Sequence, residues 1–203
     1  MNTKYEFTGE TKIVYGRTLR RIKAIVAIGA TVAPGDIGGW IESENNLSVS
    51  GNAWVYGDAE VYGNACVFGN ARVYFNACVY GNAMVSGNAE VYGNASVHGD
   101  AWVSGNAKVS GNAWVYGDAE VYGDAKVSGN ADYMTFKNSW SSGGWFTYTA
   151  SNKKWKVGCF YGTGDELVSK AYADSELSGK CYEAIVRAVE TIEAARKVIG
   201  GAE

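Results

Sequence analysis

The amino-acid sequence predicts a mainly β fold in which very short strands wind into a stacked solenoid, and three repeating positions carry this prediction. Valine occupies every sixth position from Val49 to Val127, fourteen times without a gap, and alanine does the same from Ala53 to Ala131. Glycine fills a third position from Gly51 to Gly129 with one exception, Phe75, and Asn or Asp always follows it. A strict period of this length outweighs local propensity and indicates a repeat architecture.

Each six-residue unit can be interpreted as a short strand followed by a tight corner. Because side chains alternate between the two faces of a strand, the alanine and the valine share one face, and the variable residue and the residue after valine share the other. Glycine accepts a left-handed backbone freely, and Asn or Asp adopts one at the least cost among the remaining residues. A strand this short is not stable alone, so the units must stack on one another.

The V-Y/S-G-N/D-A-x unit resembles the hexapeptide repeat of left-handed parallel β-helix proteins, and the resemblance covers residues 49–132 without interruption. In that family three hexapeptides form one triangular coil of 18 residues, which implies between four and five coils in the 84 residues here. The left hand is implied by the resemblance and not by the period, since general crossover rules favour a right hand.

A vertical repeat of 18 residues sorts the outward-facing side chains into three columns. Opposite charges follow one another in the first column, as expected if each coil lies directly on the last. The columns contain Trp54, Arg72, Glu90, Lys108 and Lys126; Glu60, Cys78, Ser96, Trp114 and Asp132; and Cys66, Met84, Trp102 and Glu120. Cys66 and Cys78 fall in different columns, which argues against a disulfide between them.

The sequence before the repeats predicts a separate N-terminal part over residues 1–48. A β-hairpin is expected from Thr11–Tyr15 and Thr18–Ile25, with its turn around Gly16-Arg17. The remainder of this part is expected to form an irregular first coil, because a solenoid needs an atypical unit to cover its open end.

The sequence after the repeats predicts a β-sheet followed by helices over residues 133–203. A hairpin turn is expected at Ser141-Ser142-Gly143-Gly144. The expected elements are strands at Tyr133–Trp140, Trp145–Ala150 and Lys154–Phe160 and helices at 165–173 and 179–199.

The composition excludes several classes of function. A net charge of −3 lacks the basic excess typical of nucleic-acid-binding proteins, and no run of 18 apolar residues is available to span a membrane. A single histidine and four dispersed cysteines without a CxxC pair predict no metal site, and no cofactor-binding motif is found. The first residues lack the apolar stretch of a secretory signal, so we expect reduced thiols and a cytoplasmic location.

Large aromatic side chains on the outside of the repeats are the main functional lead. Eight of the fourteen positions after valine are Tyr or Phe, and Phe75 replaces the corner glycine directly after Tyr74. One interpretation is a ladder of tyrosines that packs on itself. The other is a binding or subunit surface, because exposed aromatics are favoured at contacts. This second interpretation predicts a surface of Trp54, Tyr56, Tyr74, Phe75 and Tyr92.

Two further apolar surfaces are candidates for subunit contacts. An outward strip of the repeats contains Phe68, Met84 and Trp102 beside Cys66. The second helix carries an apolar face that either packs on the solenoid or sheet or meets another helix across an oligomer axis, because three of its isoleucines keep heptad spacing. That face contains Tyr182, Ile185, Val186, Val189, Ile192 and Ile199.

The segments at the two ends of the repeats resemble a narrower group. The segment from Gly38-Gly39-Trp40 to Ser48 resembles the entry segment of uncharacterised hexapeptide-repeat proteins of bacteriophages and prophages, and Gly158-Cys159-Phe160 with Asp165-Glu166 resembles the segment that follows their repeats. The resemblance implies a homotrimer and brings no catalytic residue. It implies a non-enzymatic protein that interferes with a host process, including antiviral defence, by binding a host protein or sequestering a small ligand.

Two other functions stay open. Hexapeptide β-helices include acyltransferases that use a histidine as general base between subunits, and His98, outward between Tyr80 and Tyr116, is the candidate here. A histidine acts as a base only when a second group orients it near a substrate. Its simpler interpretation is one more aromatic member of a surface column. A purely structural or virion-associated role is the other alternative.

Overall fold

The structure is a computed structural model that describes residues 2–140 and 143–200, with the side chains of residues 199 and 200 left out. Within this part the chain divides into two compact units, Met1–Asp132 and Tyr133–Glu203. The first is a parallel β-solenoid of about five coils with an N-terminal cap, and the second is an antiparallel sheet with helices. Each unit is described by itself below.

The N-terminal cap begins with a β-hairpin of β1 (Tyr5–Val14) and β2 (Arg17–Ala24). Tyr15 and Gly16 form the turn with φ angles of 48° and 76°, which is the left-handed geometry that suits a tight hairpin. The predicted turn is therefore one residue too late. Strand β1 also starts before the expected Thr11, because a register shift between Phe7 and Thr11 lets the strand continue through Gly9.

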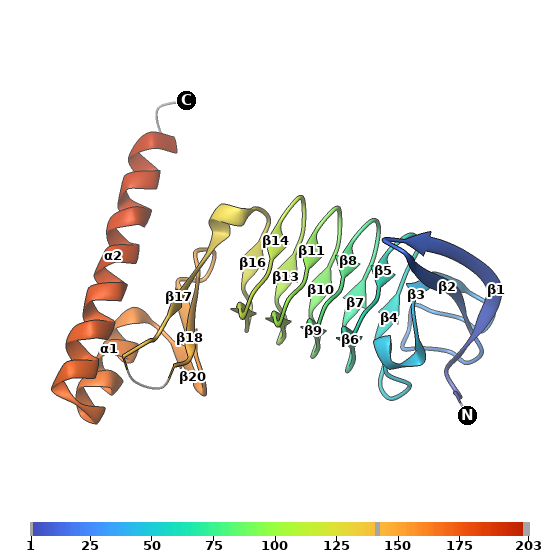
Figure 1. The fold of residues 1–203 in the computed structure, drawn as a ribbon, viewed down its shortest axis with the longest axis horizontal. Coiled ribbons are helices and arrows are strands. Elements are labelled where there is room, and N and C mark those ends of the chain that lie inside the picture. Colours follow the sequence, from blue (N-terminus) through green and yellow to red (C-terminus); the bar gives the residue numbers. More distant parts are fainter. Residues whose placement is uncertain (1, 141–142, 201–203) are drawn as a thin grey trace. The chain divides into compact units, whose positions relative to one another are not determined.

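The solenoid is built from two-residue strands, each paired in parallel with the strand 18 residues further along the chain (Figure 1). Three sheets result within the described residues, in the orders β1-β2-β3-β5-β8-β11-β14, β16-β13-β10-β7-β4 and β15-β12-β9-β6. Their strands are β3 (Ile37–Ile41), β4 (Trp54–Val55), β5 (Glu60–Val61), β6 (Cys66–Val67), β7 (Arg72–Val73), β8 (Cys78–Val79), β9 (Met84–Val85), β10 (Glu90–Val91), β11 (Ser96–Val97), β12 (Trp102–Val103), β13 (Lys108–Val109), β14 (Trp114–Val115), β15 (Glu120–Val121) and β16 (Lys126–Val127). The predicted vertical columns are confirmed down to Trp114, Glu120 and Lys126.

The interior of the solenoid is lined by the repeated alanines and valines, which are fully buried from Ala53 to Val127. Val49 is an exception: 47% of it is exposed, so the prediction that it lines the interior is wrong. Leu47 takes its place and bridges Val67, while Ile41 of β3 pairs with Val61. Both offsets are 20 residues rather than 18, since 61 − 41 and 67 − 47 are both 20, because a 3-10 turn at Glu44–Asn46 lengthens the first coil.

The last repeat also departs from the pattern. Residues Asn130–Asp132 form a 3-10 turn, and Ala131 is exposed instead of buried. Asp132 does not continue the second column below Trp114. Its carboxylate oxygen Oδ2 accepts hydrogen bonds from the backbone N–H groups of Ser128 and Gly129, at 2.6 and 3.0 Å. The polar end residue thus satisfies backbone donors at the end of the solenoid.

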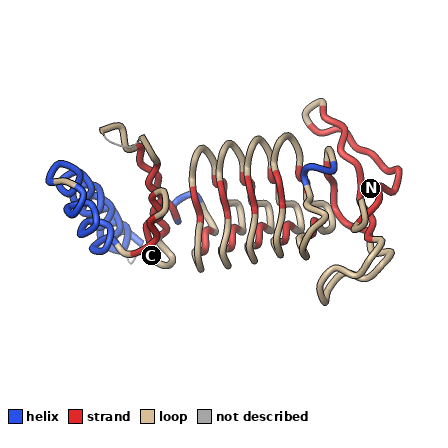
Figure 2. The backbone as a smooth tube through the Cα atoms, turned by 90° about the horizontal axis from the view of Figure 1, so that it is seen from below, coloured by secondary structure: helices blue, strands red, loops and turns tan. Residues whose placement is uncertain are grey.

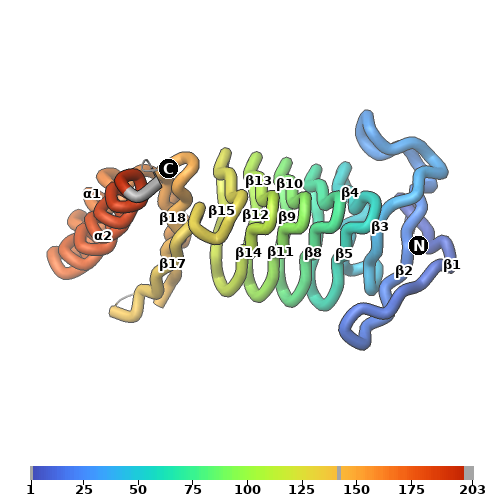
Figure 3. The backbone as a smooth tube through the Cα atoms, turned by 90° about the horizontal axis from the view of Figure 1, so that it is seen from above, coloured from blue at the N-terminus to red at the C-terminus, as the bar shows by residue number. Residues whose placement is uncertain are grey.

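The corners of the coils are joined by ladders of side-chain amides. Each amide nitrogen donates to the side-chain oxygen of the residue 18 positions later, at 2.9 to 3.2 Å. The longest ladder runs from Asn52 through Asn70, Asn88 and Asn106 to Asp124. Figures 2 and 3 show the turns that carry these ladders as regular bands between the short strands. The ladders explain why the position after glycine is always Asn or Asp.

The second unit is an antiparallel sheet in the order β17-β18-β19-β20. Its strands are β17 (Tyr133–Lys137), β18 (Trp145–Thr149), β19 (Lys154–Val157) and β20 (Phe160–Gly162). The predicted strand Lys154–Phe160 is therefore two strands, because Gly158 turns the chain with a φ of 53°. Of the predicted turn between β17 and β18, Ser141 and Ser142 lie outside the described residues.

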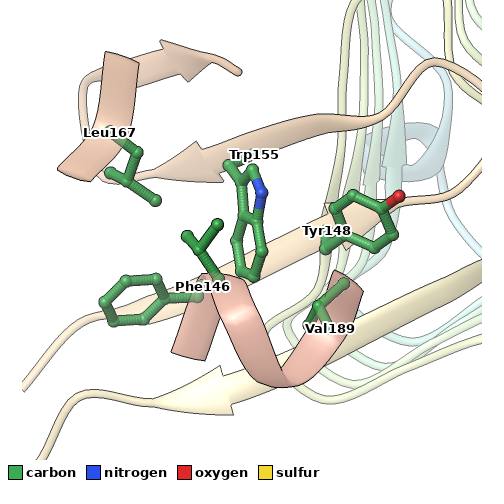
Figure 4. Close-up of a cluster of buried hydrophobic side chains, with 6 residues drawn as sticks. Phe146, Tyr148, Trp155, Leu167 and Val189 are labelled. Atoms are coloured by element: carbon green, nitrogen blue, oxygen red, sulfur yellow. The ribbon is translucent and has the colours of Figure 1, made fainter. Parts of the chain in front are cut away.

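Helices α1 (Gly164–Asp174) and α2 (Glu176–Gly200) complete the second unit. Thr163 caps α1: its hydroxyl accepts from the Glu166 backbone N–H, and the Glu166 carboxylate accepts from the Thr163 backbone N–H. The buried cluster of this unit joins the sheet to both helices around Trp155 (Figure 4). Its members are Phe146, Tyr148, Trp155, Leu167, Val186 and Val189. Within the described residues, neither helix is both long and apolar enough to cross a lipid bilayer.

Candidate functional site

Tyr56, Tyr74 and Tyr92 form a vertical column of rings on the sheet that contains β4, β7 and β10, as the 18-residue repeat predicts. The rings of Tyr74 and Tyr92 are stacked, with centroids 4.9 Å apart and planes 3° apart. Tyr56 meets Tyr74 edge to face at 6.5 Å. The regular stack is therefore interrupted between the Tyr56 and Tyr74 levels, and the faces of these two rings are not closed against each other.

Phe75 lies beside this interruption. It replaces the corner glycine and has a φ of 59°, a left-handed conformation that costs a bulky residue about 1–2 kcal/mol. Its side chain is 63% exposed, and its ring contacts Tyr74 at a centroid distance of 5.2 Å. Phe75 thus combines a strained backbone with an exposed apolar ring.

The corner at Phe75 is wider than a neighbouring corner of the solenoid. A Cβ atom added to Gly63 would lie 3.2 Å from the carbonyl oxygen of Gly81 in the next coil. A Cβ atom added to Gly57, which precedes Phe75 by one coil, would meet no heavy atom within 4 Å. The exception in the glycine position therefore coincides with a local gap between two coils.

An open hollow of about 560 Å³ lies at this corner, a size typical of small-molecule sites. Its wall from the N-terminal cap includes Thr31, whose hydroxyl oxygen lies 3.1 Å from the hydroxyl oxygen of Tyr56. We define the aromatic hollow as the space lined by Thr31, Tyr56, Gly57, Asp58, Arg72, Tyr74, Phe75 and Asn76.

Arg72 supplies a positive charge to the aromatic hollow. The neighbouring acid in its column, Glu90, accepts a hydrogen bond from the Tyr74 hydroxyl at 2.9 Å and forms an ion pair with Lys108 at 3.3 Å. Burial and the bond to Glu90 raise the pKa of Tyr74, which keeps its hydroxyl protonated as the donor. Among the described residues, none forms an ion pair with the Arg72 guanidinium, which is exposed.

Trp54 lies outside the aromatic hollow, although the sequence suggested an outward position for it. Its side chain is 1% exposed and meets the ring of Tyr5 edge to face at 6.2 Å. The N-terminal strand β1 covers it, which the repeat pattern alone does not reveal. Conversely, Thr31 was missed because it comes from an irregular loop. Arg72 could have been found, since strand alternation places it on the same face as Tyr74.

His98 occupies a second aromatic column on the opposite set of strands. Its ring is stacked between Tyr80, at 4.7 Å, and Tyr116, at 5.5 Å, as the sequence predicts. Burial lowers the pKa of His98, so the neutral form is favoured. No described residue forms a hydrogen bond with its buried Nε2 atom, and the orienting partner that general-base catalysis requires is not among the described contacts of this ring.

A second hollow, of about 420 Å³, adjoins this column and was missed from the sequence. It is lined by Tyr15, Tyr62, Cys78, Tyr80, Ser96 and Trp114. Burial, together with the nearby Glu60 carboxylate, raises the pKa of the Cys78 thiol to about 11. The thiol is therefore protonated near neutral pH and a poor nucleophile.

The residues predicted to make subunit contacts are placed as follows. Met84 is 38% exposed, Phe68 is half-buried, and the indole N–H of Trp102 donates to the Ser86 hydroxyl at 2.9 Å. On α2, Ile185 packs on the core of its own unit and Ile192 is 40% exposed. The side chain of Ile199 lies outside the described residues.

Comparison with known families gives one result. Residues 77–91 match the model of the YdcK beta solenoid repeat. Together with the parallel β-solenoid of the structure, this match supports a repeat β-helix protein. No curated protein matches the chain. Within the part that the structure describes, no group of three or more His, Cys, Asp or Glu residues is placed to hold a metal ion.

Proposed function

We propose that this protein is a non-enzymatic binding protein whose partner occupies the aromatic hollow. The observation that carries the proposal is the coincidence, at one corner, of the exception in the glycine position, a strained and exposed Phe75, and the aromatic hollow itself. Glycine would serve the corner at lower cost, so the phenylalanine calls for a role outside the folding of the repeat.

The surroundings of Phe75 support a binding role over a packing role. A residue that packs within its own subunit is expected to be buried, yet Phe75 is 63% exposed. The adjoining rings of Tyr56 and Tyr74 are held in place by Thr31 and Glu90, respectively, so the aromatic wall is ordered before a partner arrives. Preorganised aromatic groups bind at a low entropic cost.

The setting of this function is part of the proposal. The resemblance of the entry and exit segments to bacteriophage and prophage proteins favours a role in the host cytoplasm, where the protein would interfere with a host process, including antiviral defence. The partner would be a host protein or a small ligand. The same resemblance favours a homotrimer, with Met84, Trp102 and Ile192 as candidate contact residues.

The proposal is tested by recovering the protein from a bacterial cytoplasm and identifying what accompanies it by native mass spectrometry and pull-down. The test variant is Phe75→Gly, and the control is Tyr116→Ser, which removes an exposed aromatic ring from the equivalent repeat position of another face. We expect the bound species to be lost from Phe75→Gly and retained by Tyr116→Ser.

Retention of every bound species by a folded Phe75→Gly variant would reject the aromatic hollow as the binding site. Turnover of acetyl-CoA or of an acyl-carrier donor by the native protein, abolished in His98→Ala, would replace the proposal by the acyltransferase alternative.

A further inference from the structure

We propose that the aromatic hollow selects a small ligand that combines a planar ring with one anionic group. This inference rests on the proposed function and adds the chemical class of the partner. It follows from three features of the walls: an open aromatic ring, an unpaired planar cation and a rim of polar groups.

The aromatic wall favours a planar ring. One face of Tyr74 is already covered by the stacked ring of Tyr92, but Tyr56 meets Tyr74 only by its edge, and the ring of Phe75 is 63% exposed. An added ring can continue the offset or edge-to-face packing that these side chains already show. A branched aliphatic group would cover the same rings without this geometry, so the wall favours flat ligands.

The charge in the aromatic hollow favours an anion. The Arg72 guanidinium presents a planar fork of donors, which matches a carboxylate or a phosphate in a bidentate contact. The acid that would otherwise neutralise it, Glu90, is occupied by the Tyr74 hydroxyl and by Lys108. The cation is therefore available to a ligand, whereas the neighbouring Lys108 is already paired.

The rim limits the ligand to one anionic group. Asp58 also lines the aromatic hollow, and among the described residues none donates a hydrogen bond to its carboxylate. A second negative group near Asp58 would be repelled, whereas an N–H or O–H group of the ligand would be accepted. The side-chain amide of Asn76 offers a further polar contact at this rim, although it also donates to Asn94. The ligand is thus expected to carry its anion at the Arg72 side and a donor at the Asp58 side.

Both phosphates and carboxylates fit this description, so the test uses a probe of each kind with a neutral partner. Adenosine 5′-monophosphate is compared with adenosine, and indole-3-acetate with indole-3-acetamide. Binding to the intact protein is measured by isothermal titration calorimetry and by NMR titration of the probe. We expect at least one anionic probe to bind, with its neutral partner at least tenfold weaker.

The variants assign the contact to Arg72. Arg72→Gln should weaken the anionic probe about tenfold and leave the neutral one unchanged, as expected for loss of one charge-assisted contact. Arg72→Lys, which keeps the charge without the planar fork, should weaken it less. Lys126→Gln removes an equal charge from the same column three coils away and should have no effect. Thermal melting checks that each variant is folded.

Binding of the phosphate probe alone or of the carboxylate probe alone identifies the source of the anion and supports the inference. Equal binding of charged and neutral probes, unchanged binding in Arg72→Gln, or no binding of either anionic probe would overturn it. If neither probe binds but a cellular partner is still lost in Phe75→Gly, the ligand class is wrong and the proposed binding function stands. If no partner depends on Phe75, the proposed function itself fails.

Discussion

Phe75 shows how one residue changes the local geometry of a repeat. Its left-handed backbone occupies the conformation that glycine adopts at neighbouring corners, such as Gly81 with a φ of 73°. The Cβ atom and ring are the additions, and they coincide with the gap opposite Gly57. The functional lead of this molecule therefore resides in a single departure from an otherwise strict pattern.

We predict that Phe75→Gly is more stable than Phe75→Ala by about 1 kcal/mol, because only glycine relieves the left-handed strain while both variants remove the ring. Chemical denaturation of the two variants beside the native protein measures the difference. Phe75→Gly should be at least as stable as the native protein. A loss of several kcal/mol in both variants would instead assign Phe75 to the packing of its own subunit.

We predict a pH dependence that belongs to His98. Burial lowers its folded pKa below the ordinary value of 6.5, so the unfolded chain takes up a proton more readily than the folded chain. The contribution to stability is complete above about pH 6.5 and is lost as the pH falls through the lower folded pKa. Melting of the native protein should therefore fall more between about pH 8 and about pH 5 than melting of His98→Tyr, which keeps the stack. Equal slopes would contradict this.

At the scale of elements, the sequence predicts regular parts well and irregular parts poorly. The strand columns follow from the period, because a fixed 18-residue rise leaves one register. Val49 fails because the period says nothing about the 3-10 turn that lengthens the first coil. The strand Lys154–Phe160 fails because alternation continues through Gly158, whose φ of 53° reverses the chain. Tertiary contacts and single dihedral angles decide these cases.

We predict that helix α1 depends on the cap at Thr163. Thr163→Ala removes the hydroxyl that accepts from the Glu166 backbone N–H and should lower the free energy of unfolding of the second unit by about 1 kcal/mol. Thr163→Ser keeps the oxygen and should be nearly neutral. Chemical denaturation followed by tryptophan fluorescence can measure both, since Trp155 lies in the core of this unit. A similar loss in both variants would implicate the methyl group instead of the cap.

At the scale of the whole molecule, the solenoid depends on an unbroken dry interior. We predict that Val91→Asp unfolds the first unit, because Val91 is fully buried between Val73 and Val109 and an unpaired carboxylate cannot be solvated there. Tyr92→Ser, the adjacent outward residue, should leave the unit folded. Circular dichroism and thermal melting distinguish the two. A folded Val91→Asp variant with an unchanged melting temperature would reject this register.

The candidate site could be predicted only in part at this scale. The positions of Tyr56, Tyr74, Phe75 and Tyr92 follow from the repeat, because the period fixes which side chains share a column. The wall at Thr31 and the covering of Trp54 by Tyr5 depend on how the N-terminal cap folds back on the first coils. These contacts join segments far apart in the sequence, and no local pattern encodes them.

The amide ladders have a consequence for how a protein of this kind changes length. Each rung donates toward the later coil, and the longest ladder stops at Asp124, whose carboxylate accepts from Asn106 but has no proton to pass on. Duplicating 18 residues ahead of Asp124 would add one rung and preserve every column, whereas duplicating six would rotate all downstream faces by a third of a turn and separate Tyr74 from Tyr92. Evolution can therefore lengthen or shorten this solenoid only in whole turns if its surface is to keep its meaning.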